Sequence, residues 1–236
     1  MSIDYVIPAP AIVGLPVAGT DALFPVRRVY CVGRNYAGHA REMGSDPDRE
    51  PPFFFCKPSD SAAVVPVAAG QTASLPYPPL TSNYHYECEL VVAIGKGGSD
   101  IAIADAASHI FGYAVGFDMT RRDLQFTMRD AGRPWEIGKA FDYSAPVGTL
   151  HRAADAGDIG NAAISLDVDG TRKQASHVSH LIWSIGETIA KLSTLFRLEP
   201  GDLIFTGTPE GVSAVQRGQT LLGKVDGLSD LSVTIV

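Results

Sequence analysis

The sequence predicts one β-rich domain of the α+β class, and three observations support this. Short apolar runs that suit strands outnumber the segments with helical periodicity. Turns join most of these runs, so the regular alternation of strands and helices that builds a parallel sheet is not expected. The chain has 236 residues, of which 45% are hydrophobic, and this is ample for a single large core.

The first 25 residues differ in composition from the rest. They are rich in Pro, Ala and Gly with short apolar pieces, which favours an extended arm over a separate domain. We expect residues 1–25 to pack across the body as an N-terminal arm and residues 26–236 to form the domain itself.

From Arg28 onward the chain alternates short strands with turns. The first strand is VYCVG (29–33), and Gly44 is expected to stop the brief helix that follows. The residues that favour this helix are Ala37, Ala40, Arg41 and Glu42. The next strands are predicted at FFFCKP (53–58), AVVPV (63–67) and, after a Pro-rich connector, YHYECELVVAI (84–94).

The second half adds further strands and helices. An Ala-rich helix is expected at Ile101–Ser108, and a longer one follows from apolar residues at three- and four-residue spacing, closed by Pro200 and Gly201. The apolar residues of the longer helix are Ile182, Ile185, Ile189, Leu192 and Phe196. Strands are predicted at IFGYAVGFDMT (110–120), AISLDVDG (163–170) with its DG turn, DLIFTGTPEGV (202–212) and LSVTIV (231–236).

Residues 121–148 are polar and punctuated by glycine. This composition predicts a long functional loop around a short helix. Glycine and charge within its RDAGRPW segment (129–135) make residues 126–135 a candidate lid over a site.

Charge excludes some classes of function. The net charge is −7 and the Lys and Arg residues are scattered, so no basic stripe is available to bind nucleic acid. The same negative charge repels an anionic metabolite at long range, so such a ligand would have to be held by a few local cations or by a metal. The glycine turn IGKGGSDI lacks the spacing of a phosphate-binding loop.

Cysteine usage and hydropathy predict a cytoplasmic protein. Cys31, Cys56 and Cys88 are odd in number, widely spaced and embedded in apolar runs, as is typical of reduced residues. No paired Cys or His pattern suggests zinc. No leader segment and no run of membrane-spanning length occurs, so no membrane partner is expected.

Glu87 and Glu89 lie two apart in the predicted strand 84–94, so their side chains point to the same face. If that face is buried, a divalent cation is the simplest partner that neutralises both carboxylates. A solvent-exposed face of an antiparallel sheet explains the spacing equally well. Asp118 ends the apolar run FGYAVGF and could complete an all-oxygen site for Mg²⁺ or Mn²⁺, or it could be an ordinary helix N-cap.

His39 and Glu42 lie three apart and therefore on one helical face. A carboxylate that orients an imidazole can make it a base for water, although a surface ion pair has the same spacing. Lys139, between apolar residues, is either directed at an anion or reaches for solvent. Arg34, Arg122 and Gln125 are ambiguous in the same way.

Six motifs, taken in order, resemble the fumarylacetoacetate hydrolase family. They are GRNYAGHAREMG (33–44), FFFCKPSD (53–60), YHYECELVVAIGK (84–96), GYAVGFDMTRRDLQ (112–125), WEIGKAFDYSAPVG (135–148) and GDLIFTGTPEGV (201–212). The resemblance covers the chain from about residue 28 to the C-terminus. It implies that residues 26–236 form the family's catalytic domain, a roll of mixed β-sheets, and that the protein is a homodimer.

The resemblance also implies roles for individual residues. Glu87, Glu89 and Asp118 would bind Mg²⁺ or Mn²⁺, with Ca²⁺ a further candidate. His39 with Glu42 would activate water, and Lys139 would contact the bound substrate. The residues that would shape the substrate site are Arg34, Arg122, Gln125 and Thr208.

A chain with room for only a short N-terminal arm resembles the family branch that acts on acylpyruvates and related 2-oxo acids. We therefore expect a metal-dependent hydrolase that cleaves a carbon–carbon bond of an acylpyruvate, with fumarylpyruvate of gentisate breakdown as the expected substrate. The alternatives are an acetylpyruvate hydrolase and a decarboxylase of oxaloacetate or a related β-keto acid. A non-catalytic sensor of metal and dicarboxylate is disfavoured, because it needs neither His39 nor Glu42.

Overall fold

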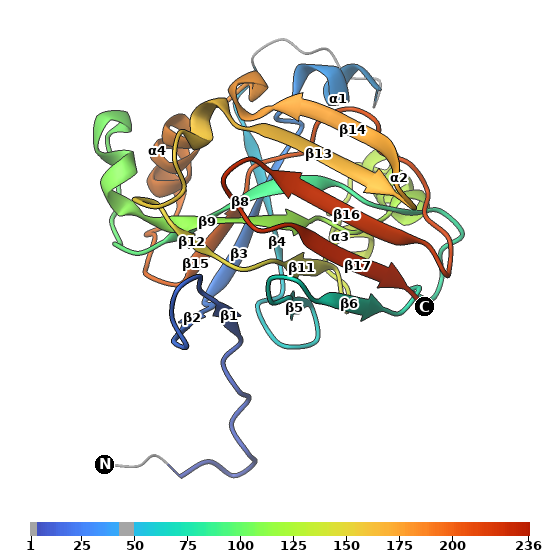
Figure 1. Cartoon of the computed structure of the whole chain (residues 1–236), viewed down its shortest axis with the longest axis horizontal. Coiled ribbons are helices and arrows are strands. Elements are labelled where there is room, and N and C mark those ends of the chain that lie inside the picture. The colour runs from blue at the N-terminus through green and yellow to red at the C-terminus, as the bar shows by residue number, and fades with distance from the viewer. Residues whose placement is uncertain (1–3, 43–49) are drawn as a thin grey trace.

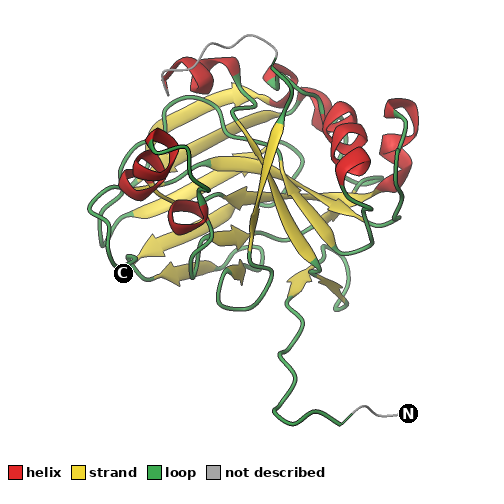
Figure 2. Ribbon diagram, turned by 180° about the vertical axis from the view of Figure 1, so that it is seen from behind, coloured by secondary structure: helices red, strands yellow, loops and turns green. Residues whose placement is uncertain are grey.

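The computed structural model describes residues 4–42 and 50–236. Within these ranges the strands form two large sheets and two short pairs, and the two large sheets lie one against the other (Figure 1). Helices lie around these sheets (Figure 2). The fold is a β-rich α+β roll of mixed sheets, so the predicted fold class is confirmed.

The larger sheet, as far as the chain is described, has eight strands. Its order is β4-β3-β15-β8-β9-β11-β5, with β12 also paired to β9. The strands are β3 (Arg28–Gly33), β4 (Phe53–Lys57), β5 (Val64–Pro66), β8 (Cys88–Ile94), β9 (Ile110–Phe117), β11 (Ala145–Val147), β12 (His151–Arg152) and β15 (Asp202–Phe205). The sheet is mixed, since β15 runs parallel to β3 and β11 parallel to β5 while β8 and β9 are antiparallel.

The smaller sheet has five strands among the described residues, in the order β14-β13-β16-β17-β6. They are β6 (Thr72–Leu75), β13 (Ala163–Val168), β14 (Thr171–His177), β16 (Thr220–Val225) and β17 (Leu231–Ile235). Asp169 and Gly170 join β13 to β14 with φ of 49° and 76°, the left-handed conformation that a two-residue hairpin turn requires. The predicted DG turn is therefore confirmed.

Helices and short strand pairs complete the fold. The α-helices are α1 (Ala37–Glu42), α2 (Arg122–Asp130), α3 (Glu136–Lys139) and α4 (Ile185–Leu195). The 3₁₀ helices are η1 (Ile103–His109), η2 (Ile159–Asn161) and η3 (Val178–His180). The short pairs are β1 (Gly14–Pro16) with β2 (Leu23–Pro25), and β7 (Tyr84–His85) with β10 (Thr120–Arg121). No helix in the described ranges is long and apolar enough to cross a membrane.

Strand β8 is buried on both faces, and this places the site within the core. Cys88 and Leu90 pack toward residues of the smaller sheet. Further along β8, Val92 and Ile94 pack with residues of α4. Val91, on the opposite face, packs with residues of the β1–β2 hairpin. An acid on this strand therefore cannot face solvent, which rules out the exposed interpretation of Glu89.

The N-terminal arm has two parts that differ in burial. Residues 13–26 contribute buried side chains such as Leu15 and Phe24 to the core. Residues 4–12 are exposed and run away from the body (Figure 1). The expected packing across the body therefore holds only for the second part.

Some elements differ from the sequence expectations. The expected strand 84–94 is interrupted at Tyr86 and Glu87, because β7 pairs with β10 while β8 joins the larger sheet. The expected loop 121–148 contains two helices, α2 and α3. Ile182 lies outside α4, since Ser184 and Glu187 form a capping box that starts the helix at Ile185. The predicted stop at Gly44 lies outside the described residues.

Candidate metal centre and pocket

Three carboxylates meet in the interior. Glu87, Glu89 and Asp118 are only 5%, 2% and 1% exposed, and each offers an oxygen within 4.8 Å of the others. Glu87 precedes β8, Glu89 lies in it, and Asp118 directly follows β9. Because β8 and β9 are antiparallel with Cys88 opposite Phe117, the start of one strand meets the end of the other. The N-cap of α2 is Arg121, so Asp118 is not a helix cap.

Three cationic side chains are buried around these acids. Lys139 Nζ lies 3.0 Å from Glu87 Oε2 and 2.7 Å from Asp118 Oδ2, and it also donates to Thr120. Lys57 Nζ lies 2.8 Å from Asp118 Oδ1. Arg122 pairs with Glu87 through Nη2 and donates to Gln125 through Nη1. The direct partners of these three cations are Glu87 and Asp118.

The two glutamates have different environments. Burial opposes ionisation of Glu87, but the positive charges of Lys139 and Arg122 outweigh it and lower its pKa. No cation among the described residues pairs with Glu89, and burial together with the charges of Asp118 and Glu87 raises its pKa well above the usual range. Its Oε2 accepts a 2.7 Å hydrogen bond from the Gly207 N–H. Gly207 has a φ of +100°, and a side chain there would meet Asn35, so glycine is required at this contact.

The three carboxylates fit a divalent metal ion. All three carboxylates are buried, and no described cation pairs directly with Glu89. Opposite oxygen ligands of Mg²⁺ lie about 4.2 Å apart, and one oxygen of each carboxylate lies within 4.8 Å of the others. Carboxylate oxygens are the ligands that Mg²⁺ and Mn²⁺ prefer. The arrangement supports a divalent metal and does not select between these ions.

His39 and Glu42 lie beside the metal centre on α1. His39 Nδ1 is 3.4 Å from Glu42 Oε2, and Glu42 also accepts from the Gly211 N–H at 3.2 Å. Burial opposes ionisation of Glu42, but the hydrogen bonds from His39 and Gly211 outweigh it and lower its pKa. His39 is 6% exposed and lines the pocket, whereas Glu42 lies behind it. The imidazole is therefore buried at the pocket, while the carboxylate that it contacts stays partly exposed.

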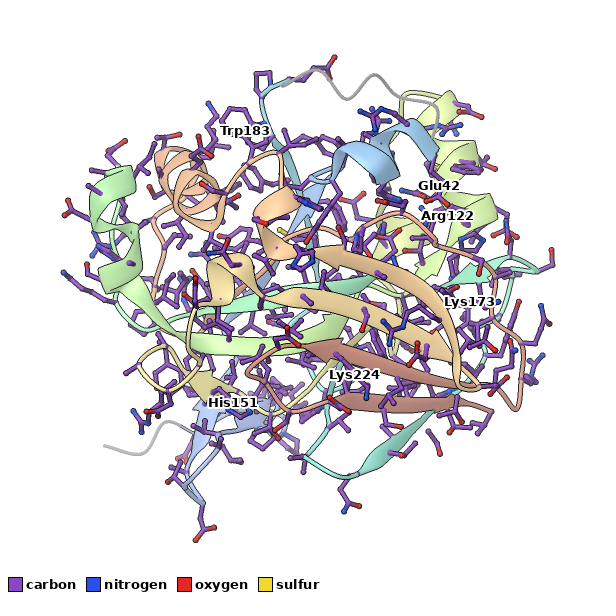
Figure 3. All side chains as sticks on the ribbon, turned by 45° about the horizontal axis from the view of Figure 1, so that its top comes forward. Glu42, Arg122, His151, Lys173, Trp183 and Lys224 are labelled. Carbon is purple, nitrogen blue, oxygen red and sulfur yellow. The ribbon has the colours of Figure 1, made fainter. Side chains whose placement is uncertain are left out.

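A single pocket of about 450 Å³ joins these groups. Besides the metal centre and His39, it is lined by Lys139 and by all four predicted substrate-site residues, namely Arg34, Arg122, Gln125 and Thr208. Thr208 Oγ1 donates to Cys88 O at 2.7 Å, and Arg34 has a φ of +56°, which is uncommon for a residue other than glycine. Figure 3 labels Glu42 on α1 and Arg122 on α2, which face the same end of the molecule.

Sequence reasoning missed several residues of this site. Lys57 was part of a quoted motif but had no assigned role, and its partners Asp118 and Lys139 are far away in sequence. Gln174 on β14 accepts from Cys88 N and donates to Thr208 Oγ1, which ties the smaller sheet to the site. Phe55, Phe126, Arg129 and Trp135 also line the pocket. The helical spacing of Arg122, Gln125, Phe126 and Arg129 was a signal that could have found the α2 residues.

Comparison with known proteins places these features in context. The model of the fumarylacetoacetate (FAA) hydrolase C-terminal family matches residues 28–236. A fumarylpyruvate hydrolase from a Ralstonia species is 46% identical over 195 residues, which cover 82% of this chain and 98% of the relative. A mitochondrial oxaloacetate decarboxylase from Dictyostelium discoideum is 36% identical over 211 residues, which cover 89% of this chain and 94% of that relative.

One solved structure is similar over almost its whole length. It is the crystal structure of fumarylpyruvate hydrolase from Pseudomonas aeruginosa in complex with Mn²⁺ and pyruvate. Its sequence is 63% identical, the TM-score is 0.96, and the match covers 99% of both chains. That neighbour therefore holds a divalent metal and a 2-oxo acid on the same fold.

Proposed function

This chain belongs to the fumarylacetoacetate hydrolase family and is a hydrolase of carbon–carbon bonds, and from this premise we propose that it cleaves acylpyruvates, with fumarylpyruvate as the preferred substrate. Water and fumarylpyruvate would give fumarate and pyruvate, as a step of gentisate breakdown. The observation that carries the proposal is one pocket that holds three buried carboxylates, an oriented histidine and a buried lysine. A non-catalytic sensor has no use for the histidine.

The proposed metal ligands are Glu87, Glu89 and Asp118. A divalent ion bound there would supply a Lewis acid for the carboxylate and the 2-oxo group of the substrate. The all-oxygen donor set favours Mg²⁺ or Mn²⁺, and Ca²⁺ is a further candidate.

His39 is the proposed base. Its Nδ1 faces Glu42, so Nε2 is the nitrogen that takes a proton from water. The water oxygen forms a bond to the 4-oxo carbon, and the bond between C3 and C4 then breaks. Its electron pair moves to the three-carbon fragment, and the imidazolium returns the proton to C3. The water oxygen therefore ends in the new carboxylate of fumarate.

Lys139, Arg122 and Gln125 are the proposed donors to negative charge that develops on the substrate. Ion pairs with Glu87 hold Lys139 and Arg122 in place, so these donors need little reorganisation during reaction. Burial opposes the charged form of Lys139, but Asp118 and Glu87 outweigh it and raise its pKa. Lys139 therefore acts as a fixed cation and not as a base. Arg34 and Thr208 are proposed to complete the substrate site from the facing walls.

A decarboxylase of oxaloacetate is the second candidate. It is favoured by the similarity to the Dictyostelium discoideum oxaloacetate decarboxylase. Such a reaction needs the same metal centre and Lys139, but no attacking water. His39 therefore matters for the hydrolase and is dispensable for the decarboxylase.

A substrate panel tests the proposal. Fumarylpyruvate, acetylpyruvate, fumarylacetoacetate and oxaloacetate are compared by kcat/KM with Mn²⁺ present. We expect fumarylpyruvate to be highest and its products to be fumarate and pyruvate in equal amounts. If oxaloacetate had the highest kcat/KM, the second candidate would be favoured. If the protein turned over none of the four substrates, the proposed enzymatic function would be wrong.

The cell compartment and assembly remain part of the proposal. We propose a cytoplasmic homodimer that acts on a small 2-oxo acid and binds neither nucleic acid nor membrane. Sedimentation velocity of the purified chain tests the dimer directly, since a species of one chain at micromolar concentration would contradict it.

A further inference from the structure

We propose that Arg129, on the last turn of α2, binds the substrate carboxylate that lies farthest from the metal centre and so selects acylpyruvates with two carboxylates. This inference rests on the proposed function, because it assigns the second end of the same substrate. It concerns a pocket residue that the sequence motifs did not single out.

Helix α2 presents one stripe of side chains to the pocket. Arg122, Gln125, Phe126 and Arg129 are spaced by three, four and seven residues and all line the pocket. Arg122, which pairs with Glu87, is 1% exposed, whereas Arg129 is partly exposed. The stripe therefore runs from the metal centre to the pocket mouth. Seven residues of helix advance about 10 Å.

The length of the stripe is comparable to the distance between the two carboxylates of the substrate. An extended chain advances about 3.4 Å for every three bonds, so the six bonds between the two carboxylate carbons of fumarylpyruvate span about 7 Å. With the pyruvate end at the metal centre, the second carboxylate lies toward the last turn of α2. The long side chain of Arg129 covers the remaining distance. Acetylpyruvate ends in a methyl group and would leave this position empty.

Arg129 is prepared to bind an anion. Its guanidinium carbon lies 4.3 Å from the centroid of the Phe126 ring, which holds the planar group in place. Its Nε pairs with exposed Asp130 at 2.8 Å, and no described residue accepts a hydrogen bond from its Nη atoms. Arg122 and Lys139 are buried and paired with Glu87, whereas Arg129 uses only its Nε for Asp130. Arginine with two available N–H groups suits bidentate binding of a carboxylate.

The test compares Arg129→Met with Arg133→Met. Arg133 is exposed, lies outside this pocket and carries the same charge, so its variant controls for the loss of one positive charge near the mouth. We expect Arg129→Met to lower kcat/KM for fumarylpyruvate by about 10- to 100-fold, the range for a lost charge-assisted hydrogen bond. Turnover of acetylpyruvate should change by less than about twofold, and Arg133→Met should change neither.

The outcomes separate this inference from the proposed function. Equal losses on both substrates, or no loss on either, would overturn the role of Arg129 while the hydrolase stands. A wild-type protein that turns over neither substrate would overturn the proposed function and this inference with it. Competitive inhibition gives a second readout: Arg129→Met should weaken inhibition by fumarate and leave inhibition by pyruvate unchanged. Arg129→Lys, which keeps the charge but not the bidentate geometry, should recover part of the activity.

Discussion

Burial of Glu89 has a measurable cost in the protein without metal. The pKa of its carboxyl is raised by burial, Asp118 and Glu87, so the folded state prefers the protonated form. In the metal-free protein this preference lowers the stability of the fold once the pH exceeds the ordinary glutamate pKa. As a proposed ligand, the same residue would contribute to the affinity for the ion.

We predict that Glu89→Gln makes the metal-free protein more stable and abolishes stabilisation by Mn²⁺. The stability of wild type relative to the variant should fall as pH rises from the ordinary glutamate range through the raised pKa, and stay level above it. Thermal unfolding with and without Mn²⁺ measures both effects. Glu199→Gln, which alters a glutamate paired with Arg197 outside the pocket, is the control. A variant that still gained stability from Mn²⁺ would contradict the ligand assignment.

The role of His39 leads to a second prediction at this scale. His39→Ala should lower kcat for fumarylpyruvate by roughly 10²- to 10⁴-fold, the usual contribution of a general base. Its Mn²⁺ affinity, measured by calorimetry, should stay within about twofold of wild type, since the histidine is not a proposed ligand. His151→Ala is a matched control, because His151 bonds to Ser229 at the other end of the molecule (Figure 3). Full activity of His39→Ala would exclude the proposed base.

Sequence reasoning succeeded for some residues and failed for others for a physical reason. The two-residue period of a strand placed Glu87 and Glu89 on one face, and the resemblance to the family implied that they bind a metal. Lys57 was missed because its position after an aromatic run does not distinguish an ammonium group in solvent from one buried in the site. Only the folded chain brings its Nζ within 2.8 Å of Asp118, which lies in a different strand connection. Long-range pairing of this kind leaves no local signal.

At the scale of elements, the antiparallel pair β8–β9 brings the acids together and the smaller sheet holds them in place. Gln174 on β14 links the two sheets, since its Oε1 accepts from Cys88 N and its Nε2 donates to Thr208 and to Pro209. Cys88 lies between Glu87 and Glu89, and Thr208 follows Gly207, whose N–H donates to Glu89.

We predict that Gln174→Leu lowers both stability and metal affinity. The buried Cys88 N–H would lose its partner, at a cost of about 1–3 kcal/mol. Urea unfolding measures the stability, and Mn²⁺ calorimetry measures the affinity. Gln71→Leu, at an exposed position, should change neither. If Gln174→Leu matched wild type in both measurements, the smaller sheet would have no part in positioning the site.

Element prediction from sequence worked where the signal was local. The β13–β14 hairpin has its DG turn, and α4 has its apolar spacing. The interruption of strand 84–94 could not be foreseen, because it depends on β10 pairing with β7 across a separation of 35 residues or more. Strand β16 was not predicted either, although Asp226 and Gly227 directly after TLLGKV are a turn signal that could have found it; its pairing with β13 and β17 defines the strand.

At the scale of the whole molecule, the fold surrounds a charged site with a continuous core. Clusters of buried apolar residues flank β8 on both faces, so the described part of the chain secludes the acids from bulk solvent. This seclusion strengthens the electrostatic interactions on which the proposed chemistry depends. The fold class was predictable from sequence, because many short strands joined by turns permit few architectures.

The most direct test of the central claim is a titration of metal into the metal-free enzyme. Wild-type protein is stripped with a chelator, Mn²⁺ is added in steps, and the release of fumarate and pyruvate from fumarylpyruvate is followed. We predict no turnover without metal and a linear rise to a plateau at one Mn²⁺ per chain. Full turnover by the stripped protein, or a plateau that is reached equally well by Glu89→Gln, would contradict a catalytic metal held by Glu87, Glu89 and Asp118.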